Sequence, residues 1–405
     1  MKIDDKTSHN SPSLRFPEFT GEWKEFSLGE IGDSFIGLTY KPTDTVPSGG
    51  IIVFRSSNIQ DGCIDYKDIV RVNKKVRENL ITKNGDLLIC ARNGSSRLIG
   101  KNALLHRTDA NQTFGAFMMV FRSDKNHFVH HLLNTKRYTS QVAENLGARI
   151  NQITSSDLSS FRFFFPKDDK EMTRIASLFD LLDGRIAVQN RLIDRLQSLM
   201  IGLNNSLYEQ YGNDITTSFM ELGYSYSGLS GKSAKDFGSG KPFITYLNVY
   251  SNIIVDETDY QYVRINDGEK QNIVRTGDVL FTLSSETPEE VGIGSVYLGE
   301  KEVYLNSFCF GIHIERNQLA YSPYLSYYVT STAFRKFIYP FAQGSTRFNL
   351  CKADFEKASI KLPSLDNQKR ISAMLDCIAE KIQAEKAILE YYNIQRQYLL
   401  RQMFI

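Results

Sequence analysis

The chain has 405 residues, of which 41% are hydrophobic and 12% aromatic, and its formal net charge is +2 at pH 7. This length and composition exclude a disordered chain and predict two sizeable hydrophobic cores, hence two domains. The N-terminus is polar and no window approaches 18 consecutive apolar residues, so we expect no secretory signal, no membrane partner and a cytoplasmic location.

The first predicted domain, residues 1–166, mixes short strands and helices. Apolar runs bounded by turn residues predict strands at 51–54, 86–90, 116–121 and 161–165. The stretch HFVHHLLNTKRYTSQVAENL predicts helix between the last two strands. This pattern indicates a compact α+β domain.

The small net charge hides a basic stretch in this domain. Residues 67–107 contain ten lysines and arginines against three acidic residues, a net of +7. Such a stretch is typical of a surface that binds a polyanion. A solvated surface is the alternative, because a sequence does not show which side chains share a face.

A long heptad helix is predicted at residues 167–212. No proline occurs between Lys167 and Tyr208, and apolar residues recur at alternating steps of four and three, as in the seam of a coiled coil. At 1.5 Å per residue this seam spans about 50 Å. Its members are Ile175, Phe179, Leu182, Ile186, Ile193, Leu196, Met200, Leu203 and Leu207, with Gln189 at one polar position.

Residues 213–364 repeat the landmarks of the first domain in the same order. SLGEIG at 27–32 returns as SFMELG at 218–223, and KNGDLLICARNG returns as RTGDVLFTLSSE. Weaker echoes pair FRSSNI with TYLNVY, and GARINQITSSDLSSFRFFFP with GSTRFNLCKADFEKASIKLP, which aligns Asn151 with Asn349. The spacing stays between 190 and 198 residues, so we interpret the chain as a tandem duplication of a unit of roughly 195 residues.

A second heptad helix is predicted at residues 365–405, with Glu385 aligned to Gln189 and with Arg396 as a further interruption. Polar residues at matched seam positions are typical of register-setting in coiled coils. An antiparallel helix pair with a domain at each end is the simplest topology, because the second helix must run back. Two apolar stripes that merely cover separate cores are the alternative. The second seam comprises Ile371, Leu375, Ile378, Ile382, Glu385, Leu389, Tyr392, Leu399 and Met403.

Few residues suggest catalysis. SGLSGKS resembles a phosphate-binding loop, but Tyr226 stands where its first glycine is required. His127, His130 and His131 have a helical spacing that could bind a metal, but no further ligand is evident. The five cysteines include no CxxC pair, which indicates reduced thiols. We therefore expect no catalytic site, metal or cofactor in this chain.

Several segments together carry a family resemblance. They are LRFPEFTGEWKEFSLGEIGD, the NGDLLI and TGDVLF turns, INQITSSDLSSFRFFFP and FNLCKADFEKASIKLP, and the helices RIASLFDLLDGRI and RISAMLDCIAEKI. In their order and duplication they resemble the DNA specificity subunits of type I restriction-modification systems. The resemblance covers nearly the whole chain.

The resemblance implies two target recognition domains, 1–166 and 213–364, each of which binds one half of a bipartite site in double-stranded DNA. The helices 167–212 and 365–405 would form an antiparallel spacer whose outer faces dock modification (methyltransferase) subunits. In such systems the modification subunits bring S-adenosylmethionine and methylate adenine, and the restriction subunits bring ATP- and magnesium-dependent translocation and cleavage. The specificity subunit has no catalytic site of its own.

We expect the DNA contacts in loops beside the repeated landmarks, because arginine can bind guanine through two hydrogen bonds and lysine mainly holds phosphate. Residues 259–299, the counterpart of the basic stretch, carry three basic and seven acidic residues, a net of −4, so the second DNA surface must lie elsewhere. The predicted contacts of the first domain are Arg71, Lys74, Lys75, Arg77, Arg92, Asn93, Arg97, Lys101, Arg149 and Asn151. Those of the second domain are Lys232, Lys235, Lys241, Tyr246, Asn248, Arg335, Lys336, Arg347 and Asn349.

Other functions stay open. The chain could serve a related methyltransferase or nuclease system, or be a nuclease or methyltransferase with an unrecognised active site. A third class, a coiled-coil adaptor that never touches DNA, predicts no salt-sensitive DNA binding by the assembled complex.

Overall fold

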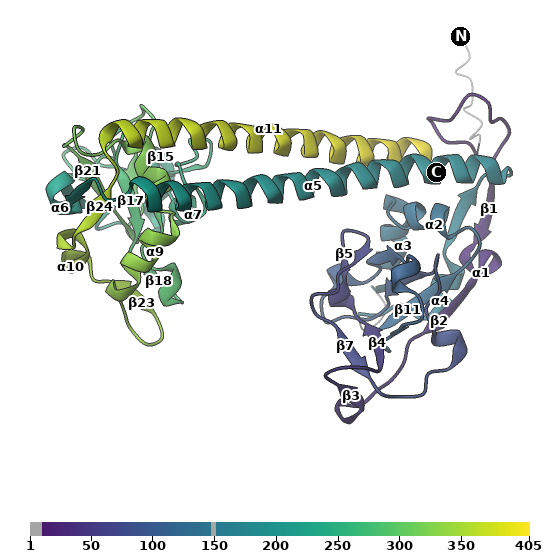
Figure 1. The fold of residues 1–405 in the computed structure, drawn as a ribbon. Helices are drawn as coiled ribbons and strands as arrows, with labels where there is room; N and C mark the ends of the chain where they lie inside the picture. The colour runs from purple at the N-terminus through teal and green to yellow at the C-terminus, as the bar shows by residue number, and fades with distance from the viewer. Residues whose placement is uncertain (1–9, 147–150) are drawn as a thin grey trace, which may run out of the picture. The chain divides into compact units, whose positions relative to one another are not determined.

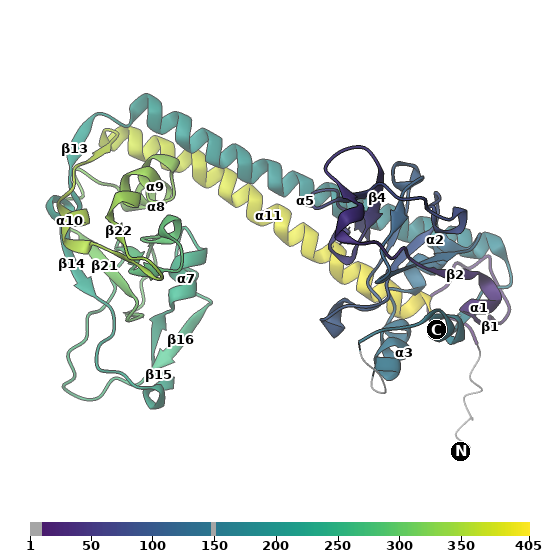
Figure 2. The same cartoon turned by 90° about the horizontal axis from the view of Figure 1, so that it is seen from below.

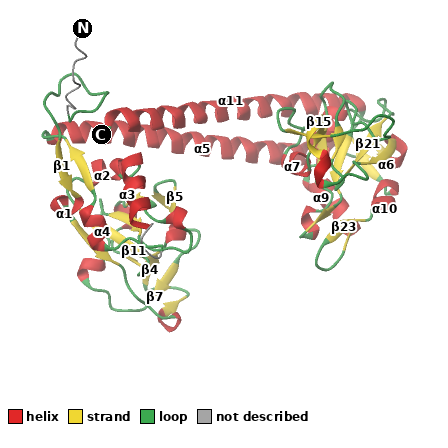
Figure 3. Cartoon of the chain, turned by 180° about the vertical axis from the view of Figure 1, so that it is seen from behind, coloured by secondary structure: helices red, strands yellow, loops and turns green. Residues whose placement is uncertain are grey.

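The fold is α+β, as predicted, with two globular domains and two long helices (Figure 1). The computed structural model describes residues 10–146 and 151–405. Figure 3 shows strands and short helices within the globular domains and the two much longer helices attached to them. Within the described residues, no helix is both long and apolar enough to cross a membrane.

Two compact units make up the chain, and both long helices are divided between them. The first unit consists of the residues up to Gln189 together with Ile388–Ile405, and the second unit is Asn190–Ala387. The helices are α5 (Asp169–Tyr211) and α11 (Leu365–Met403). Each helix therefore contributes one end to each unit instead of forming a segment of its own.

The first domain is organised around two four-stranded sheets. Its strands are β1 (Lys24–Ser27), β2 (Asp33–Ile36), β3 (Thr45–Val46), β4 (Ile51–Phe54), β5 (Ile59–Gln60), β6 (Cys63–Ile64), β7 (Val70–Val72), β8 (Leu87–Cys90), β9 (Asn102–Leu104), β10 (Thr113–Phe114), β11 (Met118–Arg122) and β12 (Arg162–Phe165). One sheet has the order β2-β11-β8-β9 and is antiparallel throughout. The other has the order β10-β4-β7-β3, in which β10 and β4 are parallel. The antiparallel pair β1 and β12 joins the start of the domain to its end.

Short helices cover this domain: α1 (Leu28–Ile31), α2 (Asn126–Leu132), α3 (Lys136–Leu146) and α4 (Ser155–Ser160). The helical stretch predicted after β11 is two helices, α2 and α3. The helix breaks there because side chains donate hydrogen bonds to backbone carbonyl groups at the end of α2. Thr135 Oγ1 donates to the Leu132 carbonyl at 2.7 Å, and Asn134 Nδ2 donates to the His130 carbonyl at 2.8 Å.

The second domain repeats this framework. Its strands are β13 (Ile215–Thr217), β14 (Gly223–Ser227), β15 (Phe237–Ile244), β16 (Tyr260–Val263), β17 (Val279–Thr282), β18 (Ser284–Ser285), β19 (Gly294–Val296), β20 (Tyr304–Leu305), β21 (Cys309–Ile314), β22 (Ala342–Gln343), β23 (Phe348–Leu350) and β24 (Ile360–Leu362). Its helices are α6 (Phe219–Leu222), α7 (Tyr246–Ser251), α8 (Ser322–Tyr328), α9 (Thr332–Ile338) and α10 (Lys352–Lys357). The sheet β14-β21-β17-β19 corresponds to β2-β11-β8-β9, and the pair β13 and β24 corresponds to β1 and β12.

The duplicated sequence landmarks adopt the same local structure. Ser27 precedes α1, and its backbone N–H donates to the Glu30 carboxylate at 2.7 Å. Ser218 precedes α6, and its hydroxyl accepts the Glu221 N–H at 3.2 Å. Both are N-capping arrangements, which satisfy helix N–H groups that lack a partner within the helix. SLGEIG and SFMELG thus mark the entrance to each domain.

Strand pairing corrects one detail of the sequence alignment. Arg92 is bridged to Gln152, whereas the equivalent Ser284 is paired with Asn349. Gln152, and not Asn151, is therefore the counterpart of Asn349. The one-residue error arose because the two asparagines match in sequence, whereas the register is fixed by backbone hydrogen bonds.

The two long helices run antiparallel and side by side within each unit (Figures 1 and 2). In the first unit, Ile175 and Phe179 of α5 share a core with Met403 of α11. In the second unit, Ile371 and Leu375 of α11 share a core on which Met200, Leu203 and Leu207 of α5 pack. Every predicted seam position, including Gln189 and Glu385, is buried or half-buried.

The last turn of α11 and Phe404 just after it are part of the first core, and loss of the Phe404 side chain should destabilise that domain. Phe404 is 8% exposed, with ring centroids 5.2 Å from Phe128 and 5.6 Å from Phe179. We expect Phe404→Ala to lower the free energy of unfolding of the first domain by about 3 kcal/mol, because it opens a cavity. Trp23, the only tryptophan, is 2% exposed in this core and reports its unfolding by fluorescence. Tyr398→Ala, a control at a 54% exposed position of α11, should change it by no more than about 0.5 kcal/mol.

Candidate nucleic-acid interface

A polar cluster forms where β8 ends in the first domain. The Arg92 side chain is exposed there, and the bridge to Gln152 brings a distant segment alongside it. Asn93 Nδ2 donates to Ser56 Oγ at 3.0 Å, and Asn151 Nδ2 donates to the Gly94 carbonyl at 3.1 Å. The structure therefore brings together three predicted contacts, Arg92, Asn93 and Asn151, on one edge of the domain.

The other basic residues of the first domain occupy separate positions. Arg71 lies half-buried in β7, and the loop after it exposes Lys74, Lys75 and Arg77. Lys74 is partly engaged, because its Nζ donates to the Thr39 carbonyl at 2.9 Å. Arg97 is exposed and Lys101 is half-buried, while Arg149 lies outside the described residues.

The second domain has an equivalent edge with different side chains. Asn349 and Arg347 are exposed on and beside β23, and Asn349 is paired with Ser284. The Tyr246 hydroxyl donates to the Ser284 carbonyl at 2.9 Å, and burial raises the Tyr246 pKa. Three predicted contacts, Tyr246, Arg347 and Asn349, thus gather around β18 and β23.

An acidic side chain lies at this second edge. Glu290 accepts hydrogen bonds from the Tyr250 hydroxyl at 2.8 Å and from Ser285 Oγ at 3.0 Å. These hydrogen bonds, that of Tyr250 first, lower the Glu290 pKa and keep the carboxylate ionised at neutral pH. The edge therefore offers an acceptor beside β18.

Asn248 does not qualify as a DNA contact, because it is fully buried. Its Nδ2 donates to the carbonyls of Asp256 and Asp259, both at 2.9 Å. Asn58 in the first domain does the same with the carbonyls of Asp65 and Asp68. These two asparagines hold the loop that follows them, and that structural role explains the echo of FRSSNI in TYLNVY.

Lys232 and Arg335 also have structural roles. The Lys232 side chain is 5% exposed and lies 2.5 Å from the Glu269 carboxylate, and its hydrogen bond lowers the Glu269 pKa to about 2. Arg335 donates to the carbonyls of Glu289, Val291 and Gly292. Both predictions of DNA contact are therefore dropped, since the charged groups are already bound within the protein. The lysine of SGLSGKS is thus no phosphate ligand.

The remaining predicted contacts of the second domain are exposed. Lys235 lies in a 3-10 turn, Lys241 lies on β15 beside a bulge, and Lys336 lies on α9.

Two phenylalanines that we did not select from the sequence lie beside the clusters. Phe117 precedes β11 and is 59% exposed, and Phe308 precedes β21 and is 57% exposed. In the sequence they look like ordinary members of apolar strand runs. Their shared place in the repeat, 191 positions apart, was the signal that could have identified them.

The three histidines of α2 hold this helix in place, with His127 and His131 against α5 and His130 against β9. His127 and His131 both contact Asp180, with His131 Nε2 at 2.8 Å, and His130 Nδ1 lies 3.0 Å from Asn102 Oδ1. Within the described residues, His130, His131 and Asp183 place possible metal ligands within 4.8 Å of one another. The Arg396 guanidinium binds the Asp183 carboxylate at 2.5 Å, so the negative charge of Asp183 is already balanced by an arginine.

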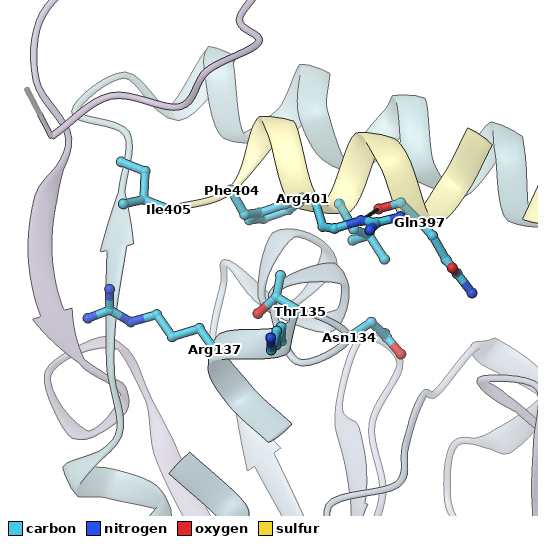
Figure 4. Close-up of a pocket in the computed structure, with 9 residues that line it drawn as sticks. Asn134, Thr135, Arg137, Gln397, Arg401, Phe404 and Ile405 are labelled. Atoms are coloured by element: carbon cyan, nitrogen blue, oxygen red, sulfur yellow. Dashed lines mark hydrogen bonds between the residues drawn. The ribbon is translucent and has the colours of Figure 1, made fainter. Parts of the chain in front are cut away.

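A cavity of about 330 Å³ lies where α11 meets the first domain (Figure 4). Arg137 of α3 and Arg401 of α11 reach it from opposite sides, but Arg137 is bound to Glu25 at 2.7 Å. The second domain has a similar cavity of about 430 Å³ where Met200 and Asn204 of α5 meet Tyr327. The residues that line these cavities offer no pairing of nucleophile and base, so we interpret both as packing gaps at the helix ends.

Comparison with known proteins identifies the family of the sequence. Residues 20–198 and 229–391 match the family described as type I restriction modification DNA specificity domain, so the matches cover most of the chain and include both domains.

Two curated relatives belong to restriction systems. The specificity subunit of the type I restriction enzyme EcoKI from Escherichia coli (strain K12) is 26% identical over 64% of this chain and 60% of its own length. The specificity subunit of StySPI from Salmonella potsdam is 27% identical over 44% of this chain and 40% of its own length. The matched stretches thus span only about half of these relatives.

Solved structures share the fold. The S subunit of a type I restriction-modification system from M. genitalium aligns over 98% of this chain and 99% of its own, with a TM-score of 0.57 and 16% identity. A chain from a study of complex assembly and conformational transition of the type I R-M system covers 93% of this chain and 96% of its own, with a TM-score of 0.56 and 19% identity.

The buried His130 should make the first domain sensitive to acid. Its side chain is 7% exposed, and burial lowers its pKa from 6.5 to about 3. The unfolded chain therefore takes up this proton first, and stability falls as the pH drops from about 6.5 towards 3. Between pH 7.5 and pH 5 the loss should be about 2 kcal/mol, measured by denaturant unfolding with Trp23 fluorescence. His130→Gln should flatten this dependence, whereas His127→Gln should keep it; equal slopes in all three proteins would contradict the assignment.

Proposed function

The chain belongs to the family of type I restriction modification DNA specificity domains, and on that basis we propose that it is the DNA sequence-recognition subunit of a type I restriction-modification complex. Each globular domain binds one half of a bipartite site in double-stranded DNA. The chain itself performs no catalysis and acts in the cytoplasm.

The observation that carries this proposal is a duplicated frame with different surfaces. The two domains share strand order, capped entrance helices and buried asparagine anchors. At equivalent edges, however, the first domain presents Arg92 and Asn93 and the second presents Arg347, Asn349 and Glu290. Two similar folds that differ in hydrogen-bonding groups suit the recognition of two different half-sites, because bases are distinguished by donor and acceptor patterns.

The long helices serve two roles in this proposal. Their seam sets the spacing of the half-sites, and their outer faces bind the modification subunits. Apolar side chains exposed on these helices support the second role: Leu181, Val188, Leu199 and Ile201 on α5, and Met374, Tyr391, Ile394 and Tyr398 on α11. Tyr208 is half-buried against Tyr328 and does not belong to this surface.

Catalysis and cofactors belong to the partners in this proposal. S-adenosylmethionine is bound by the modification subunits, and ATP and magnesium are used by restriction subunits.

The experiment is selection from a randomised duplex library by the chain assembled with its modification subunit. We expect enrichment of one bipartite motif, with binding that weakens steeply as salt rises. Methylation or cleavage by the purified chain alone, with S-adenosylmethionine or magnesium, would instead support the alternative of an unrecognised active site. Absence of salt-sensitive DNA binding by the assembly would support an adaptor.

Lengthening both helices by one heptad tests the spacer. We expect seven residues inserted after Gln189 and seven after Glu385 to lengthen the pair by about 10 Å, or roughly three base pairs at 3.4 Å each. The selected half-sites should keep their sequences and move apart by that amount, as measured by the same selection. An insertion after Gln189 alone is the matched control, because it breaks the antiparallel register and should abolish selection. An unchanged spacer in the double insertion would refute this role of the helices.

A further inference from the structure

Phe117 and Phe308 occupy the same position in the two domains. Met118 is paired with Cys90, and Cys309 is paired with Thr282, so each phenylalanine stands one residue before an inner strand of its sheet, β11 or β21. The Phe117 carbonyl accepts the Ala91 N–H at 3.0 Å, and the Phe308 carbonyl accepts the Leu283 N–H at 2.9 Å. The fold uses the backbone of these residues, and this contact places no requirement on the side chain.

Both rings are nevertheless large, apolar and exposed. Of the 26 phenylalanines in the chain, three are exposed among the described residues, and two of them are Phe117 at 59% and Phe308 at 57%. The third, Phe237, is 41% exposed and packs on Phe243 with ring centroids 5.4 Å apart. A single exposed apolar side chain needs no explanation. The same exposed ring at the same site of two domains whose surfaces otherwise differ indicates a function that both domains share.

The surroundings of the two rings are polar. The Arg92 guanidinium carbon lies 5.3 Å from the centroid of the Phe117 ring, and Asn93 follows Arg92 at the strand end. Beside Phe308, the partner strand continues from Leu283 into Ser284, which is paired with Asn349. An occupant of these sites must offer apolar surface together with hydrogen-bonding edges, and in the first domain negative charge as well. Double-stranded DNA combines all three properties, because its bases offer apolar surface and hydrogen-bonding edges in the groove and its phosphates carry the negative charge.

We propose that Phe117 and Phe308 are the apolar base contacts of the two domains, one for each half-site. This inference rests on the proposed function. Each ring packs on a base or a base step in the groove, where phenylalanine can contact a thymine methyl group or insert between bases. The polar side chains beside it determine which bases are accepted.

The test uses the assembled complex, with Phe117→Ala, Phe308→Ala and, as a matched control, Phe237→Ala. Library selection gives the motif, and titration of the selected duplex gives affinity. Loss of a base contact of this kind should weaken binding by roughly 10-fold or more. We expect Phe117→Ala to relax the sequence of one half-site and Phe308→Ala that of the other. The Phe237→Ala variant should bind as the wild type does.

The salt dependence separates a base contact from a phosphate contact. Neither phenylalanine variant should change the slope of affinity against salt, whereas Arg92→Gln should reduce it by about one if this arginine holds a phosphate. Wild-type affinity and specificity in both alanine variants would overturn the inference. The inference would also be overturned if the alanine variants lost the modification subunit while the complex that stayed assembled bound DNA as the wild type does. The rings would then contact protein. If the wild-type complex selects no motif, the proposed function itself fails.

Discussion

The first core includes Leu400 and Met403 of the last turn of α11, and Phe404 just after that turn packs against Phe128 and Phe179. The second core is completed in the same way, where Leu203 and Leu207 at the end of α5 pack beside Ile371. Each core therefore needs residues from both long helices. The long helices do more than link finished domains, because each of the two cores includes side chains from both helices.

The architecture could be predicted from the sequence because it depends on periodic patterns. The heptad seams, the α+β class and the duplication all depend on regular spacing, and the capped helices at Ser27 and Ser218 lie where the repeated motifs begin. The contact residues were less accessible, because burial and partners depend on distant segments. Lys232 and Arg335 are basic residues in a sequence, but only the fold shows that Glu269 and three carbonyls already hold them. Phe117 was overlooked for the opposite reason: an apolar residue beside a strand is ordinarily buried, whereas Phe117 is exposed.

The two copies solve the same structural problem with different chemistry. Asp86 and Asp278 are buried at the equivalent turn, 1% and 2% exposed, before the central β8 and β17 strands. In the first domain Arg122 binds Asp86 at 2.7 Å, which gives a permanent ion pair. In the second domain the Tyr226 hydroxyl and His313 Nδ1 both lie 2.7 Å from the Asp278 carboxylate, and burial raises the Asp278 pKa. The frame therefore tolerates substitution even at a buried charge, provided that the new partners satisfy it.

The buried asparagines have a consequence for how such a protein can change over generations. Asn58 and Asn248 satisfy their loops through backbone carbonyls, so the anchors do not depend on which side chains the loops expose. Substitutions on exposed loops typically alter stability by no more than about 0.5 kcal/mol. New surface chemistry can therefore accumulate in one domain without unfolding it and without disturbing the other. Each domain of such a chain can therefore evolve independently of the other, because backbone hydrogen bonds keep it folded while its exposed side chains vary.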